Sequence, residues 1–140
     1  RKWPQGAELF HEMICLGRPL KAVEAADINM VSQIVDDYPS LISAAVETVN
    51  DLQGKISPMP QGKIDIPKIN IPAEPKAGKQ VLSKEAVAIT MKVIKESAAA
   101  ENFNDALEIG YKGFGEIACT DAAEEGISAF LERRPPVFIK

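Results

Sequence analysis

The stretch SKEAVAITMKVIKESAAAENFNDALEIGYKGFGEIACT (residues 83–120) decides the fold of this chain. In its first half, apolar residues recur three or four positions apart, which is the period of an α-helix, at Val87, Met91, Ile94 and Ala98. Ser83 precedes this run as an N-cap residue. After Glu101 and Asn102 a second helix begins, capped by Asn104 or a neighbour, and its apolar face comprises Phe103, Ala106, Leu107, Tyr111, Phe114, Ile117 and Ala118. The sequence therefore predicts two consecutive amphipathic helices.

Three glycines interrupt the second of these helices, at positions 110, 113 and 115. Each costs about 1 kcal/mol relative to alanine in a helix interior. Two interpretations stay open. Either another helix or a ligand approaches the backbone closely here, or the helix is frayed or kinked.

Helical signals also occur on both sides of this pair. Helices are expected over residues 7–16, ended by Gly17, and over residues 20–28. Residues 30–35 read as a short extended segment. A further helix starts at Asp36-Asp37-Tyr38-Pro39 and closes at Gly54, and a last one runs from Thr120 to about Arg133, before Pro135-Pro136. The expected fold is mainly α, with little or no sheet.

Residues 54–80 differ from the rest because they hold five of the ten prolines. Within them, KIDIP (residues 63–67) is echoed by KINIP (residues 68–72). Proline lacks an amide donor and favours an extended conformation in the residue before it. An extended strap lying in an apolar groove would shelter the four isoleucines. A solvated linker and a short strand or hairpin are the alternatives.

Composition narrows the class of protein. The 140 residues are 46% hydrophobic and carry a net charge of −4, which argues against binding a nucleic-acid backbone. No window approaches the roughly 18 apolar residues needed to span a bilayer. Two distant cysteines and one histidine fit a reducing cytoplasm and predict no disulfide framework and no metal site. Because the chain opens with Arg1 and has no leader, we expect it to be a piece of a longer protein or a processed one.

Two segments resemble the C-terminal part of the enoyl-CoA hydratase/isomerase (crotonase) superfamily. One is LGRPLKAVEAADINMVSQIV (residues 16–35), in which Asn29 stands where the family usually has glycine, so the backbone there is expected to take a positive φ. The other is DAAEEGISAFLERRPPVF (residues 121–138), which is similar to the family's terminal pattern D-x-x-E-G-hydrophobic-x-A-F. The long middle also resembles members fused to a 3-hydroxyacyl-CoA dehydrogenase.

The resemblance implies a helical C-terminal module of a crotonase-like fold: residues 1–53 following the absent core, a strap or linker over residues 54–80, and a trimerisation and CoA-lid segment over residues 81–140. Family members stabilise a thioester enolate with two backbone N–H groups, and hydratases add two glutamates, but these belong to the preceding core. No catalytic residue is therefore expected in this chain, and the fragment alone is expected to be inactive. The parent would be an enoyl-CoA hydratase of fatty-acid β-oxidation, a lyase, or also an oxidoreductase in the bifunctional case.

The same resemblance implies the partners. Phe130 and Phe138 would contact the acyl or adenine side of acyl-CoA, and Lys140 a CoA phosphate. Acyl-CoA is the parent's substrate, this fragment binds no cofactor of its own, and NAD enters only if the parent is the dehydrogenase fusion. The missing core and a homo-oligomer, dimer or trimer, complete the expected partners. The alternative is a stand-alone helical oligomerisation or protein-interaction module without catalysis.

Structural interpretations compete at several residues. Phe130 at helical spacing also fits a core position, and Lys140 fits a solvated chain end. Glu24 is expected to be a surface or capping residue and His11 an exposed helix residue. Buried, inert positions are expected for both cysteines, Cys15 and Cys119, and a solvated helix end for residues 132–134.

Overall fold

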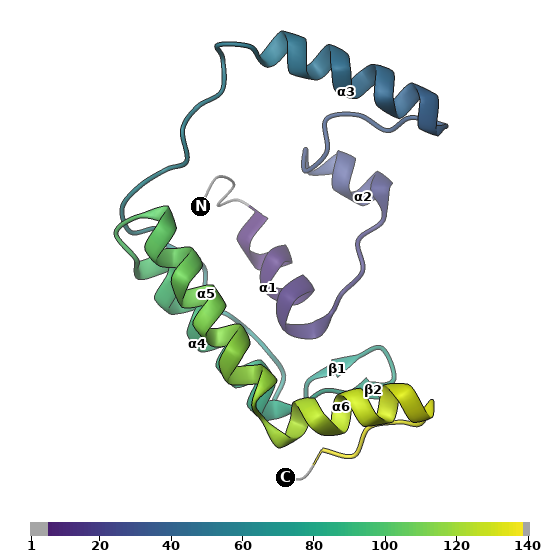
Figure 1. Cartoon of the computed structure of the whole chain (residues 1–140), viewed down its shortest axis with the longest axis vertical. Coiled ribbons are helices and arrows are strands. Elements are labelled where there is room, and N and C mark those ends of the chain that lie inside the picture. The colour runs from purple at the N-terminus through teal and green to yellow at the C-terminus, as the bar shows by residue number, and fades with distance from the viewer. Residues whose placement is uncertain (1–5, 139–140) are drawn as a thin grey trace. The chain divides into compact units, whose positions relative to one another are not determined.

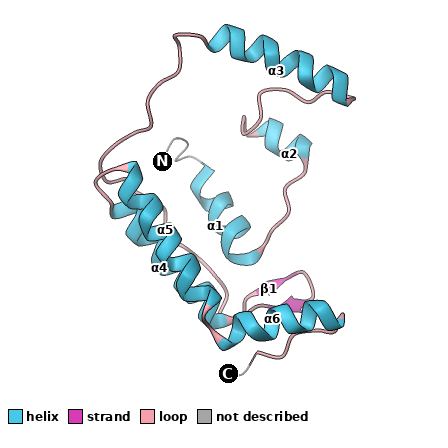
Figure 2. Cartoon of the chain, in the orientation of Figure 1, coloured by secondary structure: helices cyan, strands magenta, loops and turns pink. Residues whose placement is uncertain are grey.

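The computed structural model describes residues 6–138 and is mostly helical (Figures 1 and 2). The elements are α1 (Ala7–Leu16), α2 (Ala22–Asp27), α3 (Tyr38–Leu52), β1 (Lys76–Ala77), β2 (Gln80–Val81), α4 (Lys84–Ala99), α5 (Phe103–Ala118) and α6 (Asp121–Glu132). The only sheet in the described part of the chain is the hairpin of β1 and β2. The mainly α expectation is confirmed.

The chain forms two compact units. The described residues up to Arg18, together with those from Pro60 onward, make unit 1, and Pro19–Met59 make unit 2. This division does not follow the three consecutive segments that the sequence suggested. Helix α1 packs on α4, so it belongs to the same unit as α4, α5 and α6. In the sequence, the residues of unit 2 lie between α1 and these three helices.

Helices α3, α4, α5 and α6 each begin at a residue whose side chain caps the first turn. The side-chain oxygens of Ser83, Asn102 and Thr120 each accept a hydrogen bond from the backbone N–H three residues later, at 3.2, 2.8 and 3.1 Å. Asp37 does the same for α3 at 2.8 Å. Each bond satisfies one of the amide donors that a helix N-terminus leaves unpaired. The caps expected at Ser83 and Thr120 are confirmed, and Asn102 is the neighbour that caps α5.

The closest helix contact in unit 1 joins α4 to α5, which lie side by side (Figure 1). Gly113 is buried there, and a Cβ atom built on it would lie 2.2 Å from Cγ2 of Val93. The hydroxyl of Ser97 donates across the same interface to the carbonyl of Ala106 at 3.2 Å. Close approach is thus the reason for glycine at position 113. At Gly110 and Gly115 a Cβ atom would meet nothing within 4 Å.

From Gly62 onward, the Pro-rich segment forms a strap against α4. The N–H groups of Gly62 and Ile64 donate to the carbonyls of Glu101 and Ala98 at 2.7 and 2.9 Å. Ala98 lies in the last turn of α4, where helix carbonyls lack partners within the helix, and Glu101 follows the end of that helix. The strap therefore completes the hydrogen bonding of α4 while it crosses unit 1.

The isoleucines of the strap face inward. Ile69 is buried in a cluster with Cys15 of α1 and Val87 of α4, and Leu16, Ile71, Leu82, Met91 and Ile94 pack around it. Ile64 and Ile66 are half-buried, and the charged residues between the isoleucines are exposed. The strap in an apolar groove is confirmed for this part of the segment. The hairpin alternative holds for its end, where Gly78 at φ 61° occupies the two-residue turn between β1 and β2.

Unit 2 contains α2 and α3. Lys21 N–H donates to the Glu24 carboxylate at 3.0 Å, so Glu24 is the capping residue that the sequence predicted. Asn29 has φ 56°, which confirms the expected left-handed position. Residues 30–35, expected to be extended, form bends and irregular backbone outside any sheet. No residue of α3 is buried. No helix in residues 6–138 is long and apolar enough to cross a membrane.

Candidate functional site

The candidate site is a groove between the hairpin and α6, here called the α6–hairpin groove. Its cavity volume is about 650 Å³. The lining residues are Lys79, Gln80, Val81, Gly126, Ala129, Phe130, Arg133, Arg134, Pro135 and Pro136. This volume is in the range of pockets that hold small organic molecules.

One face of α6 forms the wall of this groove. Gly126, Ala129, Phe130 and Arg133 are spaced by three and four residues, so they share that face. Ala129 is almost completely buried, whereas the Phe130 side chain is 82% exposed. Gly126 and Ala129 have small side chains and leave space beside the helix. The Phe130 ring lines the same space. The arrangement offers an aromatic surface for stacking.

Cationic groups rim the groove. Lys79 comes from the hairpin turn and Arg133 from the end of α6, and neither forms an ion pair within residues 6–138. Arg133 ends α6 in the left-handed conformation, with φ 55°. An apolar wall beside two uncommitted cations suits an anionic ligand that also carries an apolar or aromatic part.

Arg134, by contrast, is committed to a clamp on the C-terminal tail. Its guanidinium donates to both carboxylate oxygens of Glu125, at 2.6 and 2.8 Å, and also pairs with Glu132. The Val137 N–H donates to the same Glu125 carboxylate at 2.6 Å. The Arg134 and Val137 hydrogen bonds lower the pKa of Glu125 to about 2. Residues 132–134 were expected to form only a solvated helix end. Instead, Arg134 and Glu125 hold the tail that follows the helix against α6.

Phe138, half-buried, lies in a different cavity of about 550 Å³. The lining residues of this second cavity are Glu74, Val81, Leu82, Ser83, Lys84, Glu85, Asp121, Ala122, Glu125, Val137 and Phe138. The structure thus does not bring Phe130 and Phe138 into one cavity, although Val81 lines both. The third expected contact residue, Lys140, lies outside the described residues. Phe130 does not occupy the core position that was its structural alternative.

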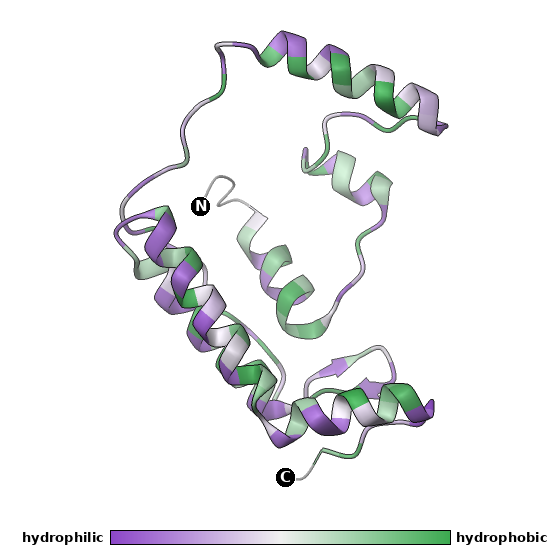
Figure 3. Ribbon diagram, in the orientation of Figure 1, coloured by the Kyte–Doolittle hydropathy of each residue, from purple (hydrophilic) through white to green (hydrophobic). Residues whose placement is uncertain are grey.

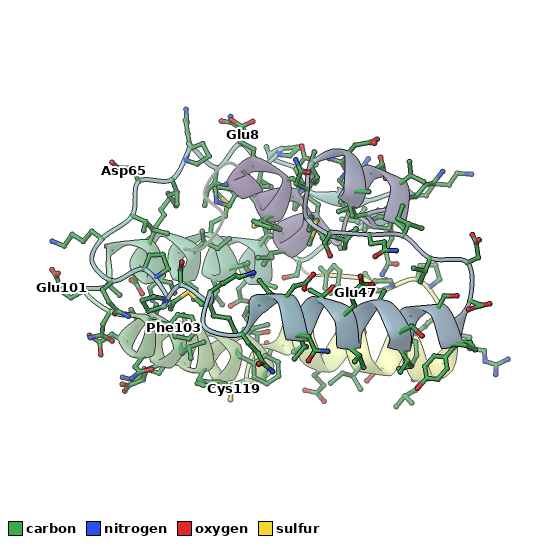
Figure 4. The ribbon with its side chains drawn as sticks, turned by 90° about the horizontal axis from the view of Figure 1, so that it is seen from above. Glu8, Glu47, Asp65, Glu101, Phe103 and Cys119 are labelled. Atoms are coloured by element: carbon green, nitrogen blue, oxygen red, sulfur yellow. The ribbon has the colours of Figure 1, made fainter. Side chains whose placement is uncertain are left out.

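Two expectations about other reactive side chains are wrong. His11 is 6% exposed rather than solvated, because its face of α1 turns toward α4 and the strap. Cys119 is exposed at the end of α5, where it points away from the ribbon (Figure 4), because the chain turns into α6 there without covering it. Cys15 is buried, as expected, and burial raises the pKa of its thiol. No group of three or more metal-ligating side chains occurs among residues 6–138.

Sequence reasoning missed the groove residues Lys79, Val81 and Arg133. The signal for the hairpin was present, because Gly78-Lys79 forms a two-residue turn with glycine first. That turn contains Lys79 and pairs β2 with β1. The signal for Arg133 was its position at the end of α6, before two prolines. The chain changes direction there, and this brings Pro135 and Pro136 into the lining of the groove.

Comparisons with known proteins add no relative to this description: no protein-family model matches the chain, and no curated protein or solved structure matches it.

Proposed function

We propose that this chain is the C-terminal portion of an acyl-CoA-processing enzyme of the enoyl-CoA hydratase/isomerase type, active in cytoplasmic fatty-acid β-oxidation. In this proposal the chain covers the CoA site and contributes to oligomerisation, while the catalytic groups lie in a crotonase core outside these 140 residues. The observation that carries the proposal is the α6–hairpin groove. Its aromatic wall and two cationic groups match the chemistry of an adenine nucleotide, in which the base can stack and the ribose carries phosphates.

The oligomerisation part is supported by apolar faces without a partner in residues 6–138. On α5, Leu107, Tyr111 and Phe114 follow helical spacing and are 42%, 74% and 75% exposed. On α3, apolar side chains along one face are also exposed, and Figure 3 shows hydrophobic and hydrophilic segments alternating along this helix. Exposed apolar patches of this kind are typical of surfaces that another chain covers.

Equilibrium binding of CoA and of 3′-dephospho-CoA, followed by calorimetry on the 140-residue chain, tests the groove. Phe130→Ala and Lys79→Gln should each weaken CoA binding about tenfold, because each removes about 1.4 kcal/mol of stacking or charge-assisted bonding. Tyr111→Ala removes an exposed aromatic side chain of α5 that does not line the groove, and should leave binding unchanged. Absence of CoA binding at millimolar concentration, or equal losses in all three variants, would refute the groove assignment.

The exposed faces of α3 and α5 also favour a second candidate, a helical oligomerisation module without a CoA site. Sedimentation velocity over a range of concentrations separates the two when combined with the binding measurement. A chain that assembles but does not bind CoA supports the module, and a chain that does both supports the enzyme portion. A monomer at every concentration contradicts both. Under the first proposal the chain alone shows no hydration of crotonyl-CoA.

A further inference from the structure

His11 is a buried ionisable residue that does not line the α6–hairpin groove. Its side chain is 6% exposed, and its ring makes no hydrogen bond or ion pair with any residue in the described part of the chain. It is the one histidine of the sequence. A buried imidazole without an acceptor is stable when neutral, but its protonated form would be a desolvated, unpaired cation.

His11 lies where α1 docks on the rest of unit 1. Cys15, one turn later on the same face, belongs to the core cluster with Ile69 of the strap and Val87 of α4. Helix α1 reaches this place from a separate stretch of chain, since residues 19–59 form unit 2 between it and the strap. Its docking therefore depends on this packing and not on continuity of the backbone.

The charges around His11 do little to accommodate a proton. Glu8, one turn earlier on α1, is the described charged group whose field acts on the ring, and its own side chain is exposed (Figure 4). Glu12 on α1 is exposed and pairs with Arg18. On the elements packed against α1 the charged side chains are all exposed to solvent; they are Lys84, Glu85, Lys92, Lys95 and Glu96 of α4, and Lys63, Asp65, Lys68 and Glu74 of the strap over residues 60–75.

We propose that His11 is a pH-sensitive latch: α1 stays docked on α4 and the strap while the imidazole is neutral, and detaches when the imidazole is protonated. This inference is independent of the proposed enzymatic role. Detachment would expose the buried face of α1, including Cys15, and would free residues 6–18 from unit 1.

The direction with pH follows from the burial. Desolvation lowers the pKa of His11 below 6.5, and Glu8 opposes this only in part. The detached helix therefore binds a proton more tightly than the docked one. Docking is strongest above pH 6.5 and weakens as the pH falls from 6.5 toward the docked-state pKa, by up to about tenfold in the opening equilibrium for each pH unit.

The two free cysteines supply the assay. Cys15 is buried on the face of α1 that packs against Ile69 and Val87, whereas Cys119 is exposed, so Cys119 reports the intrinsic reactivity of a thiol at each pH. The chain carrying Cys119→Ser and the chain carrying Cys15→Ser are reacted with 4,4′-dithiodipyridine between about pH 7.5 and about pH 5. The Cys15 rate divided by the Cys119 rate should rise about tenfold on acidification, and His11→Phe should abolish that rise. A ratio that stays flat, or that rises equally with His11→Phe, would overturn the proposal.

A second measurement needs no substitution at His11. Because the chain has one histidine, a single imidazole signal in the NMR spectrum of the native chain reports its titration without ambiguity. A midpoint below 6.5, accompanied by loss of the α1 amide protection, supports the latch. A midpoint at or above 6.5, or titration with α1 still protected, refutes it even where His11→Phe does not fold.

Discussion

Gly113 offers a sharp test of how α4 and α5 pack. In Gly113→Ala the new methyl group would lie 2.2 Å from Cγ2 of Val93 and 3.3 Å from its Cβ and Cγ1. Carbon atoms in contact are normally about 3.5–4.0 Å apart, so the helices must separate by more than about 1 Å or distort. Val93 cannot easily turn away, because a β-branched side chain on a helix has one strongly preferred rotamer.

The expected magnitude follows from two opposing effects. Overpacking a close contact costs about 1–3 kcal/mol, and an overlap as severe as this one belongs at the upper end. Alanine regains about 1 kcal/mol of helix propensity. We therefore expect Gly113→Ala to lower the free energy of unfolding by about 2 kcal/mol, measured by urea titration followed by circular dichroism at the helix band.

Two glycines of the same helix are matched controls. Gly110→Ala and Gly115→Ala place a methyl group in open space, so each should raise the free energy of unfolding by about 0.5–1 kcal/mol. Adding Val93→Ala to Gly113→Ala should recover about 1–2 kcal/mol relative to the sum of the single changes, because it removes the atoms that clash. The reasoning is refuted if Gly113→Ala stabilises the chain as the controls do, or if the double variant shows no coupling.

Three further predictions follow from the clamp, the left-handed turn and the strap. Glu125→Gln should speed amide exchange at Val137. The pKa of Glu125 falls from 4.5 to about 2 on folding, so its stabilising effect is complete above pH 4.5 and is lost as the pH falls toward 2. The difference in urea midpoint between the native chain and Glu125→Gln should therefore shrink over that range, and a difference constant with pH would contradict the clamp. Asn29→Gly should keep or slightly increase the amide protection of α2, whereas Asn29→Val should cost about 1–2 kcal/mol because a β-branched residue resists a φ of 56°; equal protection in both variants would argue against the turn. Ile69→Ala should lower the free energy of unfolding by about 2–4 kcal/mol, and Ile66→Ala, at a half-buried position, by less than half of that; equal effects would show that the strap does not dock through Ile69.

Local signals in the sequence determined most of the helices. Apolar spacing and cap residues predicted α4 and α6 with their starts at Ser83 and Thr120, because these signals act within a few residues of the position they specify. The left-handed backbone at Asn29 and the inward isoleucines of the strap were predictable for the same reason. The family resemblance named Phe130 for the candidate site, and the structure places this residue in a groove wall.

The sequence did not predict which side chains are buried or which residues line the groove. His11 and Cys119 both lie at ordinary helix positions, and only the packing of α1 on α4 and the turn from α5 into α6 decide that the first is buried and the second exposed. Lys79 and Arg133 are far apart in the chain and meet in one groove because the hairpin lies beside α6.

The sequence by itself therefore determined which segments are helical, where several of them begin, and that the isoleucines of the strap face inward, since backbone hydrogen bonds and side-chain periodicity are local. Only the tertiary structure decided that the Val93 side chain packs closely against Gly113 and that Phe130 and Phe138 line separate cavities. It also decided that α1 packs within unit 1, although residues 19–59 separate it from the rest of that unit in the sequence. The physical reason is that burial and contact depend on which surfaces meet, and surfaces distant in the chain meet through packing that no single segment encodes.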